Sequence, residues 1–175
     1  DFKLSNLRKH IAVVQQEVHL FSSSIMANIV LFDENIKEES VIDAAKEIGI
    51  HNFIMSLPGG YNYVVGERGV TLSTGQRQLI SFLRVYLRNP KILILDEATS
   101  SIDSHTEQIL QNALQKISEG RTTIVIAHRL STIVNSDKIL LLENGKVLEE
   151  GSHSKLMNEN GEYAQMYNTQ ISDKL

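Results

Sequence analysis

The chain has 175 residues, of which 42% are hydrophobic, which is enough for one domain with its own core. A formal net charge of -4 gives no electrostatic case for a nucleic-acid partner or for binding to an anionic membrane surface. The absence of cysteine excludes disulfides and thiolate zinc sites, and no apolar run approaches the roughly 20 residues needed to cross a bilayer. Any membrane-spanning part would therefore lie outside these residues.

An apolar run near the start of the chain, Ile11–Val14, predicts a buried strand of a parallel sheet. The run leads into Gln16, and a glutamine after a strand is most often a plain surface residue. The residue type alone therefore assigns no function to Gln16.

Residues 17–71 show helical spacing interrupted by turn signals. Residues 40–50 predict an amphipathic helix that Gly49 closes. Its apolar face consists of Val41, Ala44, Ala45 and Ile48. Pro58-Gly59-Gly60 predicts a turn, and residues 65–69 are by themselves typical of a solvated loop with a local Glu–Arg pair.

The stretch 72–88 opens with a capping-box pattern, in which Ser73 is followed three residues later by Gln76. Gly75 permits a tight backbone turn, so we expect a helix N-terminus whose free N–H groups and dipole attract phosphate. Taken alone, such a pattern usually marks only a helix cap. The helix ends at Asn89-Pro90. Its apolar face consists of Leu79, Ile80, Leu83, Tyr86 and Leu87.

The all-apolar run 92–95 predicts a short strand buried on both faces of a parallel sheet. Asp96 and Glu97 then emerge at the carboxyl end of that strand, where open α/β sheets place their ligands. An acidic pair after a strand is by itself more often solvated than metal-binding.

The remaining residues continue the alternation of helix and strand. Residues 105–117 predict a helix ended by Gly120, and Thr122–Ala127 predicts a strand with His128 at its end. A histidine at a strand end is more often structural than catalytic. Further elements are expected at 138–142, 146–149, 152–157 and 162–171, with core contacts from Tyr163, Met166 and Tyr167.

In this order the segments resemble the ATP-binding-cassette (ABC) family. LSTGQ (72–76) resembles the signature motif, ILILDE (92–97) resembles the Walker B strand with its glutamate, and SSID (100–103) resembles the D-loop. Gln16 corresponds to the Q-loop residue and AHRLSTI (127–133) to the segment of the switch histidine. Residues 18–22 and 65–69 resemble exporter segments beside the coupling helices of a membrane domain.

The resemblance implies an α/β fold with a RecA-like P-loop NTPase core, that is, a parallel sheet flanked by helices, and an inserted α-helical signature subdomain. Within a single domain of residues 1–175, residues 1–16 would end the first part of the core, 17–71 would form the helical subdomain, and 72–175 would hold the signature helix, the later motifs and the C-terminal core. No GxxxxGK[ST] loop occurs in the sequence. The chain thus resembles the carboxyl-terminal portion of such a domain, without its Walker A segment.

The resemblance also implies ATP hydrolysis by phosphoryl transfer to water, with ATP and Mg²⁺ as cofactors. Asp96 and Gln16 would bind the metal, Glu97 would orient the attacking water, and His128 and Gln16 would complete the catalytic set. A second group would cap the ATP of a facing domain: Ser73, Thr74, Gly75, Gln76 and Asp103. Without a phosphate loop, the isolated chain is expected to be inactive.

The expected partners are a second nucleotide-binding domain in head-to-tail contact and the coupling helices of a transmembrane domain, at the cytoplasmic face of a membrane. Thr74 stands where most relatives have glycine, and its β-branched side chain limits close approach to phosphate. Because Glu97 is intact, a heterodimeric exporter with two unequal sites is one hypothesis.

Three functions are compared. The leading one is the ATP-hydrolysing subunit of an ABC exporter. A catalytically incomplete docking module stays open because the phosphate loop is absent. A DNA-repair or chromosome ATPase would also carry a signature helix and a Walker B strand, but residues 17–71 leave no room for a long coiled coil.

Overall fold

The computed structural model describes residues 3–66, 71–97, 102–127 and 130–172. They divide into two compact units, Asp1–Ile126 and Ala127–Leu175. The prediction of a single domain stays a prediction. Residues 67–69 and 100–101 of the predicted motifs, and His128, lie outside the described residues. In the part of the chain that is described, no helix is both long and apolar enough to cross a membrane.

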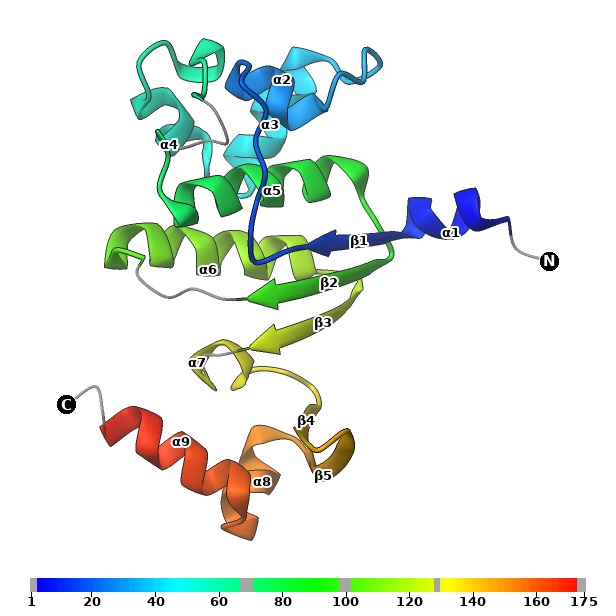
Figure 1. Cartoon of the computed structure of the whole chain (residues 1–175), viewed down its shortest axis with the longest axis vertical. Helices are drawn as coiled ribbons and strands as arrows, with labels where there is room; N and C mark the ends of the chain where they lie inside the picture. Colours follow the sequence, from blue (N-terminus) through cyan, green and yellow to red (C-terminus); the bar gives the residue numbers. More distant parts are fainter. Residues whose placement is uncertain (1–2, 67–70, 98–101, 128–129, 173–175) are drawn as a thin grey trace. The chain divides into compact units, whose positions relative to one another are not determined.

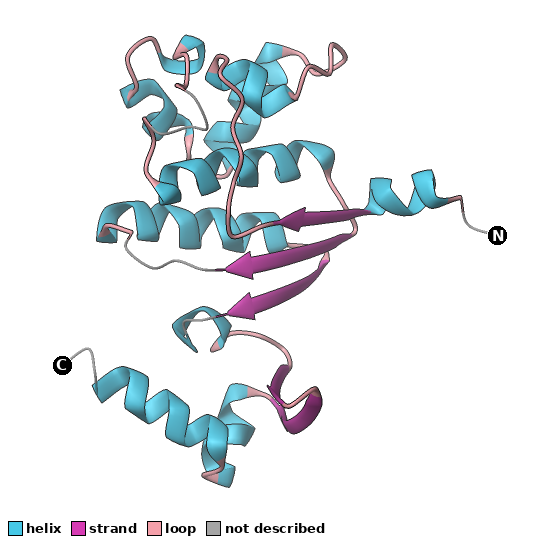
Figure 2. Ribbon diagram, viewed as in Figure 1, coloured by secondary structure: helices cyan, strands magenta, loops and turns pink. Residues whose placement is uncertain are grey.

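A sheet of three strands forms the centre of the first unit, in the order β1 (Ile11–Val14), β2 (Ile92–Glu97) and β3 (Thr122–Ala127). β1 and β2 are parallel, with Val14 opposite Leu95. All three arrows point the same way in Figure 2. The predicted parallel sheet is confirmed, and the carboxyl ends of β1 and β2 are neighbours.

The two faces of this sheet differ in how the described residues cover them. Helices α5 (Thr74–Arg88) and α6 (Ser104–Ser118) lie along one face, where Leu93 and Leu95 are buried (Figure 1). The opposite face carries half-exposed apolar side chains: Val13, Ile124 and Ile126. The prediction that both apolar strands are buried is confirmed for the face that carries Leu93 and Leu95. On the other face, Val13 of β1 is exposed and Ile94 of β2 is partly buried.

Between β1 and α5, in the stretch predicted as a helical subdomain, the chain forms short helices. They are α2 (Ile25–Val30), α3 (Glu38–Glu47), α4 (His51–Ser56) and the 3₁₀ helix η1 (Gly60–Asn62). All four apolar residues of the helix predicted over 40–50 are buried, so the amphipathic pattern of α3 is confirmed. Gly49 closes it with a φ of +80°, and the predicted turn at 58–60 is present, with Gly59 at a φ of +87°.

The second unit is a hairpin followed by two helices. β4 (Ile139–Glu143) and β5 (Lys146–Gly151) are antiparallel and joined by Asn144-Gly145, both with positive φ, before α8 (His153–Glu159) and α9 (Glu162–Ser172). The small core contains Ile139, Leu156 and Tyr163, with Tyr167 packed against it. The predicted core contact of Met166 is wrong, because its side chain is 47% exposed.

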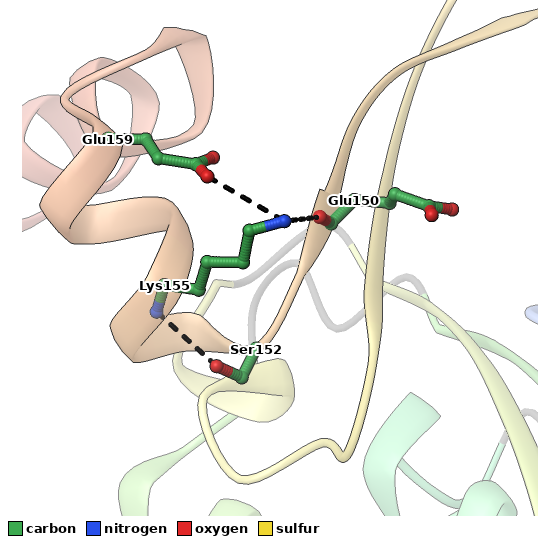
Figure 3. A network of polar contacts seen from close by, with 4 residues as sticks. All are labelled: Glu150, Ser152, Lys155 and Glu159. Carbon is green, nitrogen blue, oxygen red and sulfur yellow. Dashed lines mark hydrogen bonds and ion pairs between the residues drawn. The ribbon is translucent and has the colours of Figure 1, made fainter.

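Polar contacts on the surface of the second unit add to this packing. The Lys155 ammonium donates to the backbone carbonyl oxygen of Glu150 at 3.2 Å and pairs with the Glu159 carboxylate at 3.6 Å (Figure 3). The Ser152 hydroxyl oxygen caps α8 by accepting from the Lys155 N–H at 3.3 Å. Exposed pairs of this kind contribute little stability each, so the buried apolar residues hold this unit together.

Two short helices have no clear signal in the sequence, α1 (Leu4–His10) and α7 (Leu130–Ile133). In α1, Leu4 and Leu7 are 60% and 47% exposed, so the helix has no buried apolar stripe that a periodic pattern could reveal.

Replacing Ile54 by alanine should lower the free energy of unfolding by about 2–5 kcal/mol, because this α4 side chain is fully buried and its loss leaves a cavity. Asn52→Ala, at an exposed position of the same helix, should change it by less than about 0.5 kcal/mol. Urea denaturation followed by circular dichroism measures both. Equal effects of the two variants would mean that the helical subdomain is not packed as described.

Candidate nucleotide-binding site

Helix α5 begins with the capping box that the sequence predicts. The Ser73 hydroxyl oxygen accepts a hydrogen bond from the Gln76 N–H at 3.2 Å, and the Gln76 side-chain oxygen accepts one from the Ser73 N–H at 3.0 Å. These bonds leave the hydroxyl hydrogen of Ser73 available to donate to another group. At the other end, Asn89 has a φ of +45° and ends the helix before Pro90, as predicted.

Arg77 brings a positive charge to the start of α5. Its guanidinium donates to the Leu72 carbonyl oxygen at 2.7 Å and to the Thr74 hydroxyl oxygen at 3.1 Å. The first turn of α5 contains no acidic residue, so the guanidinium and the positive end of the helix dipole act in the same direction. This helix start therefore suits an external anion, and the Thr74 side chain is held in place beside it.

Gly75 lies where α5 and α6 meet. It is buried, and a Cβ atom built at this position would lie 2.7 Å from Cγ2 of Thr106 and 2.9 Å from Cγ2 of Ile102. The prediction that Gly75 serves a tight turn is wrong, because it lies inside the first turn of α5 and has no positive φ. Its missing side chain instead lets the two helices approach closely.

Helix α6 neutralises its own N-terminus. The Asp103 carboxylate accepts a hydrogen bond from the Thr106 N–H at 2.9 Å, and Glu107 adds a second acid to the first turn. The Thr106 backbone N–H, and then its hydroxyl, hold the pKa of Asp103 below its usual value. Of the two adjoining helix starts, only that of α5 has no acidic residue at its cap or in its first turn.

The predicted metal-binding residues follow two neighbouring strands. Because Val14 pairs with Leu95, Asp96 and Gln16 lie at the same edge of the sheet, with Asp96 partly buried and Gln16 exposed. A carboxylate and an amide oxygen fit Mg²⁺, which prefers oxygen ligands. Within the described ranges, no three His, Asp or Glu side chains gather to hold a metal alone. The remaining ligands would therefore be phosphate and water oxygens.

The structure places only some of the predicted site residues. It packs Gly75 against Ile102 and Thr106, on either side of Asp103 in the sequence, and it brings Gln16 to the same sheet edge as Asp96. Glu97 is the last residue of β2, but only its backbone is described, and His128 lies outside the described residues. The catalytic roles of Glu97 and His128 stay predictions.

Sequence reasoning missed three residues that shape this region: Arg77, Ile102 and Thr106. Arg77 could have been noticed as a basic residue one turn into a helix that was predicted to face phosphate. Ile102 and Thr106 carry no such signal, because their contact with Gly75 joins segments that are far apart in the chain.

A parallel sheet with Gln16 and Asp96 at the carboxyl ends of neighbouring strands is the arrangement in which open α/β proteins bind their ligands. A family model described as ABC transporter matches residues 2–100, which is more than half of the chain. The chain therefore belongs to the ABC transporter family, and its fold is that of the ABC ATPase domain, a RecA-like P-loop NTPase core.

Similar proteins include exporters. An ATP-dependent lipid A-core flippase of Saccharophagus degradans is 50% identical over 97% of this chain, and a putative multidrug export ATP-binding/permease protein of Staphylococcus aureus is 49% identical over 97%. The chain spans 29% of the length of each. A solved structure of a bacterial Atm1-family ABC exporter with ATP bound has a TM-score of 0.84 and 42% identity, over 95% of this chain and 29% of that chain. The expected resemblance to exporter-type nucleotide-binding domains is confirmed.

Gly75→Ala should force α5 and α6 apart, because the added methyl group would overlap Thr106 and Ile102. We expect a cost of about 1–3 kcal/mol from overpacking, partly offset by the higher helix propensity of alanine, about 1 kcal/mol. Chemical denaturation gives the stability, and the methyl resonances of Ile102 report the contact. In the control Gly120→Ala, nothing lies within 4 Å of the new Cβ, so the Ile102 methyls should not shift. Unshifted Ile102 methyls in Gly75→Ala would contradict the contact.

Asp103→Asn should make stability less dependent on acid. The folded-state pKa of Asp103 is lowered, so its charge stabilises the protein above the unfolded-state pKa of about 4. That contribution is lost as the pH falls through the lowered folded-state value. Because asparagine also caps helices well, the comparison isolates the charge. The difference in thermal midpoint between the two proteins should be constant at neutral pH and disappear in strong acid; a difference that persists there would rule out this origin.

Proposed function

We propose that the protein containing this chain is an ABC exporter. The chain would be the part of its nucleotide-binding domain that completes the ATP site and takes part in ATP hydrolysis. The observation that carries the proposal is the pairing of Val14 with Leu95, which brings Gln16 and Asp96 to one edge of the sheet. The names of the relatives, a flippase and an export permease, support export as the work that hydrolysis drives.

Hydrolysis transfers the γ-phosphoryl group to water, and negative charge spreads over the phosphate oxygens in the transition state. Bound Mg²⁺ would supply positive charge to the phosphates, with Asp96 and Gln16 as its protein ligands. Glu97 would orient the attacking water and polarise it. His128 would donate a hydrogen bond to the γ-phosphate, which stabilises the charge that develops there.

The start of α5 would act on a different nucleotide, held by a second domain in head-to-tail contact. The free hydroxyl hydrogen of Ser73, the helix dipole and the charge of Arg77 all favour a phosphate at this point. Thr74, Gly75 and Gln76 would line the same contact. Asp103 would take part across the interface, because its helix adjoins Gly75.

A transmembrane domain would be the other partner, so the chain would work at the cytoplasmic face of a membrane. The proposal has support in the length of the relatives, of which this chain spans 29%, and in the printed name of one as an ATP-binding/permease protein. The net charge of -4 speaks against a nucleic-acid partner.

Thr74 bears on whether the two nucleotide sites are equal. Its hydroxyl oxygen already accepts from Arg77, so the side chain is fixed and occupies space where most relatives have glycine. A pair with a different second domain, and two unequal ATP sites, remains part of the proposal.

The test uses the full-length protein in lipid nanodiscs, comparing Glu97→Gln with the parent. Loss of the water-orienting carboxylate should lower ATP hydrolysis by a factor of roughly 10² to 10³ while equilibrium binding of radiolabelled ATP is retained. Glu119→Gln, an exposed glutamate at the far end of α6, is the matched control and should leave the rate unchanged. Full activity in Glu97→Gln would refute the assigned role. ATP binding without hydrolysis in the parent would favour the docking module instead.

A further inference from the structure

A cavity lies between the three-stranded sheet and the helices α5 and α6, which cover one of its faces (Figure 1). Val14 and Leu95, which pair across β1 and β2, line it from the sheet together with Val125 of β3. The centres of water-sized molecules find about 40 Å³ of room in it, whereas one water needs roughly 10–15 Å³. Protein interiors contain few voids larger than one water, so the packing is incomplete at this point.

Two helix faces supply the rest of the apolar lining. Phe82 of α5 lies one turn after Gln78, and Leu114 of α6 lies one turn after Leu110, so each pair shares a face of its helix. Phe82 and Leu110 are buried, and Leu114 is partly buried against the same core. The cavity therefore has an aromatic ring on one side and leucine side chains on the other.

Gln78 is a polar residue of this lining and is only 4% exposed. In the described part of the chain its side-chain amide makes no hydrogen bond. Another buried amide, that of Asn28, accepts from the Phe21 N–H at 2.8 Å and donates to the Phe21 carbonyl oxygen at 2.9 Å. Burying an amide without partners is unfavourable, so a group inside the cavity that pairs with Gln78 would be stabilised there.

Water alone fits this cavity poorly. The buried side chains of the lining are those of Gln78 and of apolar residues, so a water held among them finds one polar partner. Buried waters typically make about three hydrogen bonds, and the room here exceeds that of a single water. A molecule with one hydrogen-bonding group and an apolar body matches both the volume and the polarity.

The charge of the lining decides against an anion. The charged residues among the described ones that line the cavity are Asp96 and Glu107, and both are acids. An anion would lose its hydration on entering and would gain no cationic partner from these residues. The lining therefore favours a neutral ligand.

We propose that the cavity binds a small neutral amphiphile of the phenol type, whose hydroxyl group pairs with the Gln78 amide and whose ring packs against Phe82, Leu110 and Leu114. A glutamine amide offers both a donor and an acceptor, so it can pair with a hydroxyl group in either direction. Asp96 lines the same cavity, so the bound molecule would lie beside the proposed metal site. Binding requires neither ATP nor Mg²⁺, and the site does not depend on the proposed function.

The experiment uses the full-length protein in lipid nanodiscs, with isotope-labelled methyl groups on its leucine and valine residues. Phenol is titrated without nucleotide, and equilibrium dialysis fixes its free concentration so that partition into lipid is not counted as binding. The methyl resonances of Leu110, Leu114 and Val125 should shift along saturating curves, with a Kd on the order of 1 mM because so few atoms make contact. The methyl resonances of Leu156, a buried residue of the second unit, should not shift.

Gln78→Met keeps the length of the side chain and removes the amide. It should weaken phenol binding roughly 2- to 12-fold, the effect of one net hydrogen bond, without weakening the binding of toluene, which has the same shape and no hydroxyl group. Gln108→Met changes an exposed glutamine of α6 and is the matched control, which should leave both affinities unchanged. Benzoate should leave the cavity methyl resonances in place, because its charge is excluded.

Cavity methyl resonances that do not respond to phenol, or respond without saturation, would overturn the site. An unchanged phenol affinity in Gln78→Met, or an equal loss for phenol and toluene, would overturn the role of the amide. Benzoate binding as tight as that of phenol would contradict the neutral ligand. If Gln78→Met does not fold, Leu114→Phe decides: the larger side chain fills part of the cavity and should abolish phenol binding, and unchanged binding would refute the site.

Discussion

The absence of a side chain at Gly75 sets the distance between α5 and α6, the two helices that carry the candidate phosphate contacts. A Cβ atom at position 75 would lie 2.7 Å from Cγ2 of Thr106 and 2.9 Å from Cγ2 of Ile102, so any larger residue would push these neighbours away from α5. The contact joins the first turn of the signature helix to the end of the D-loop. A shift of either segment is therefore transmitted to the other by direct packing, with no need for a flexible linker.

The close approach of the N-termini of α5 and α6 is electrostatically unfavourable, and the two helices compensate for it to different extents. Two helix N-termini side by side bring two positive dipole ends together. α6 cancels its own with Asp103 and Glu107, whereas α5 has a neutral serine cap and the cation Arg77. The start of α6 therefore has two acidic residues of its own, whereas the start of α5 has none. The Asp103 carboxylate is engaged by the Thr106 N–H, whereas the hydroxyl hydrogen of Ser73 is not used by its capping box.

The parts of this arrangement that sequence reasoning predicted are those governed by short spacing. The capping box spans three positions, and a run of apolar residues ending in Asp96 is enough to place a strand and its carboxyl end. The reason for Gly75 could not be found in this way, since its neighbours belong to a different helix. The half-exposed Val13 shows the same limit, because an apolar run indicates a strand without indicating what covers each face. Arg84 can be recognised in the sequence as a single cation on the apolar side of α5. Its acceptors cannot, because Asn28 and His19 lie 56 and 65 positions away.

Arg84 of α5 is partly buried, and its guanidinium donates to the carbonyl oxygens of Asn28 and His19 and to the side-chain oxygen of Asn28. These acceptors explain why a cation is used at this position. A carboxylate partner would bind it more strongly but would fix only a side chain, which can rotate. Two of its three acceptors are backbone carbonyls, so the guanidinium fixes the main chain of residues 19 and 28 directly. One of them lies in the last turn of α2, where the negative end of the helix dipole offsets part of the cost of burying the charge. None of the three acceptors titrates near neutral pH, and the two bonds to Asn28 are partly buried, which limits their screening by salt. The contact between α5 and the helical subdomain therefore keeps its geometry over a wide range of solution conditions.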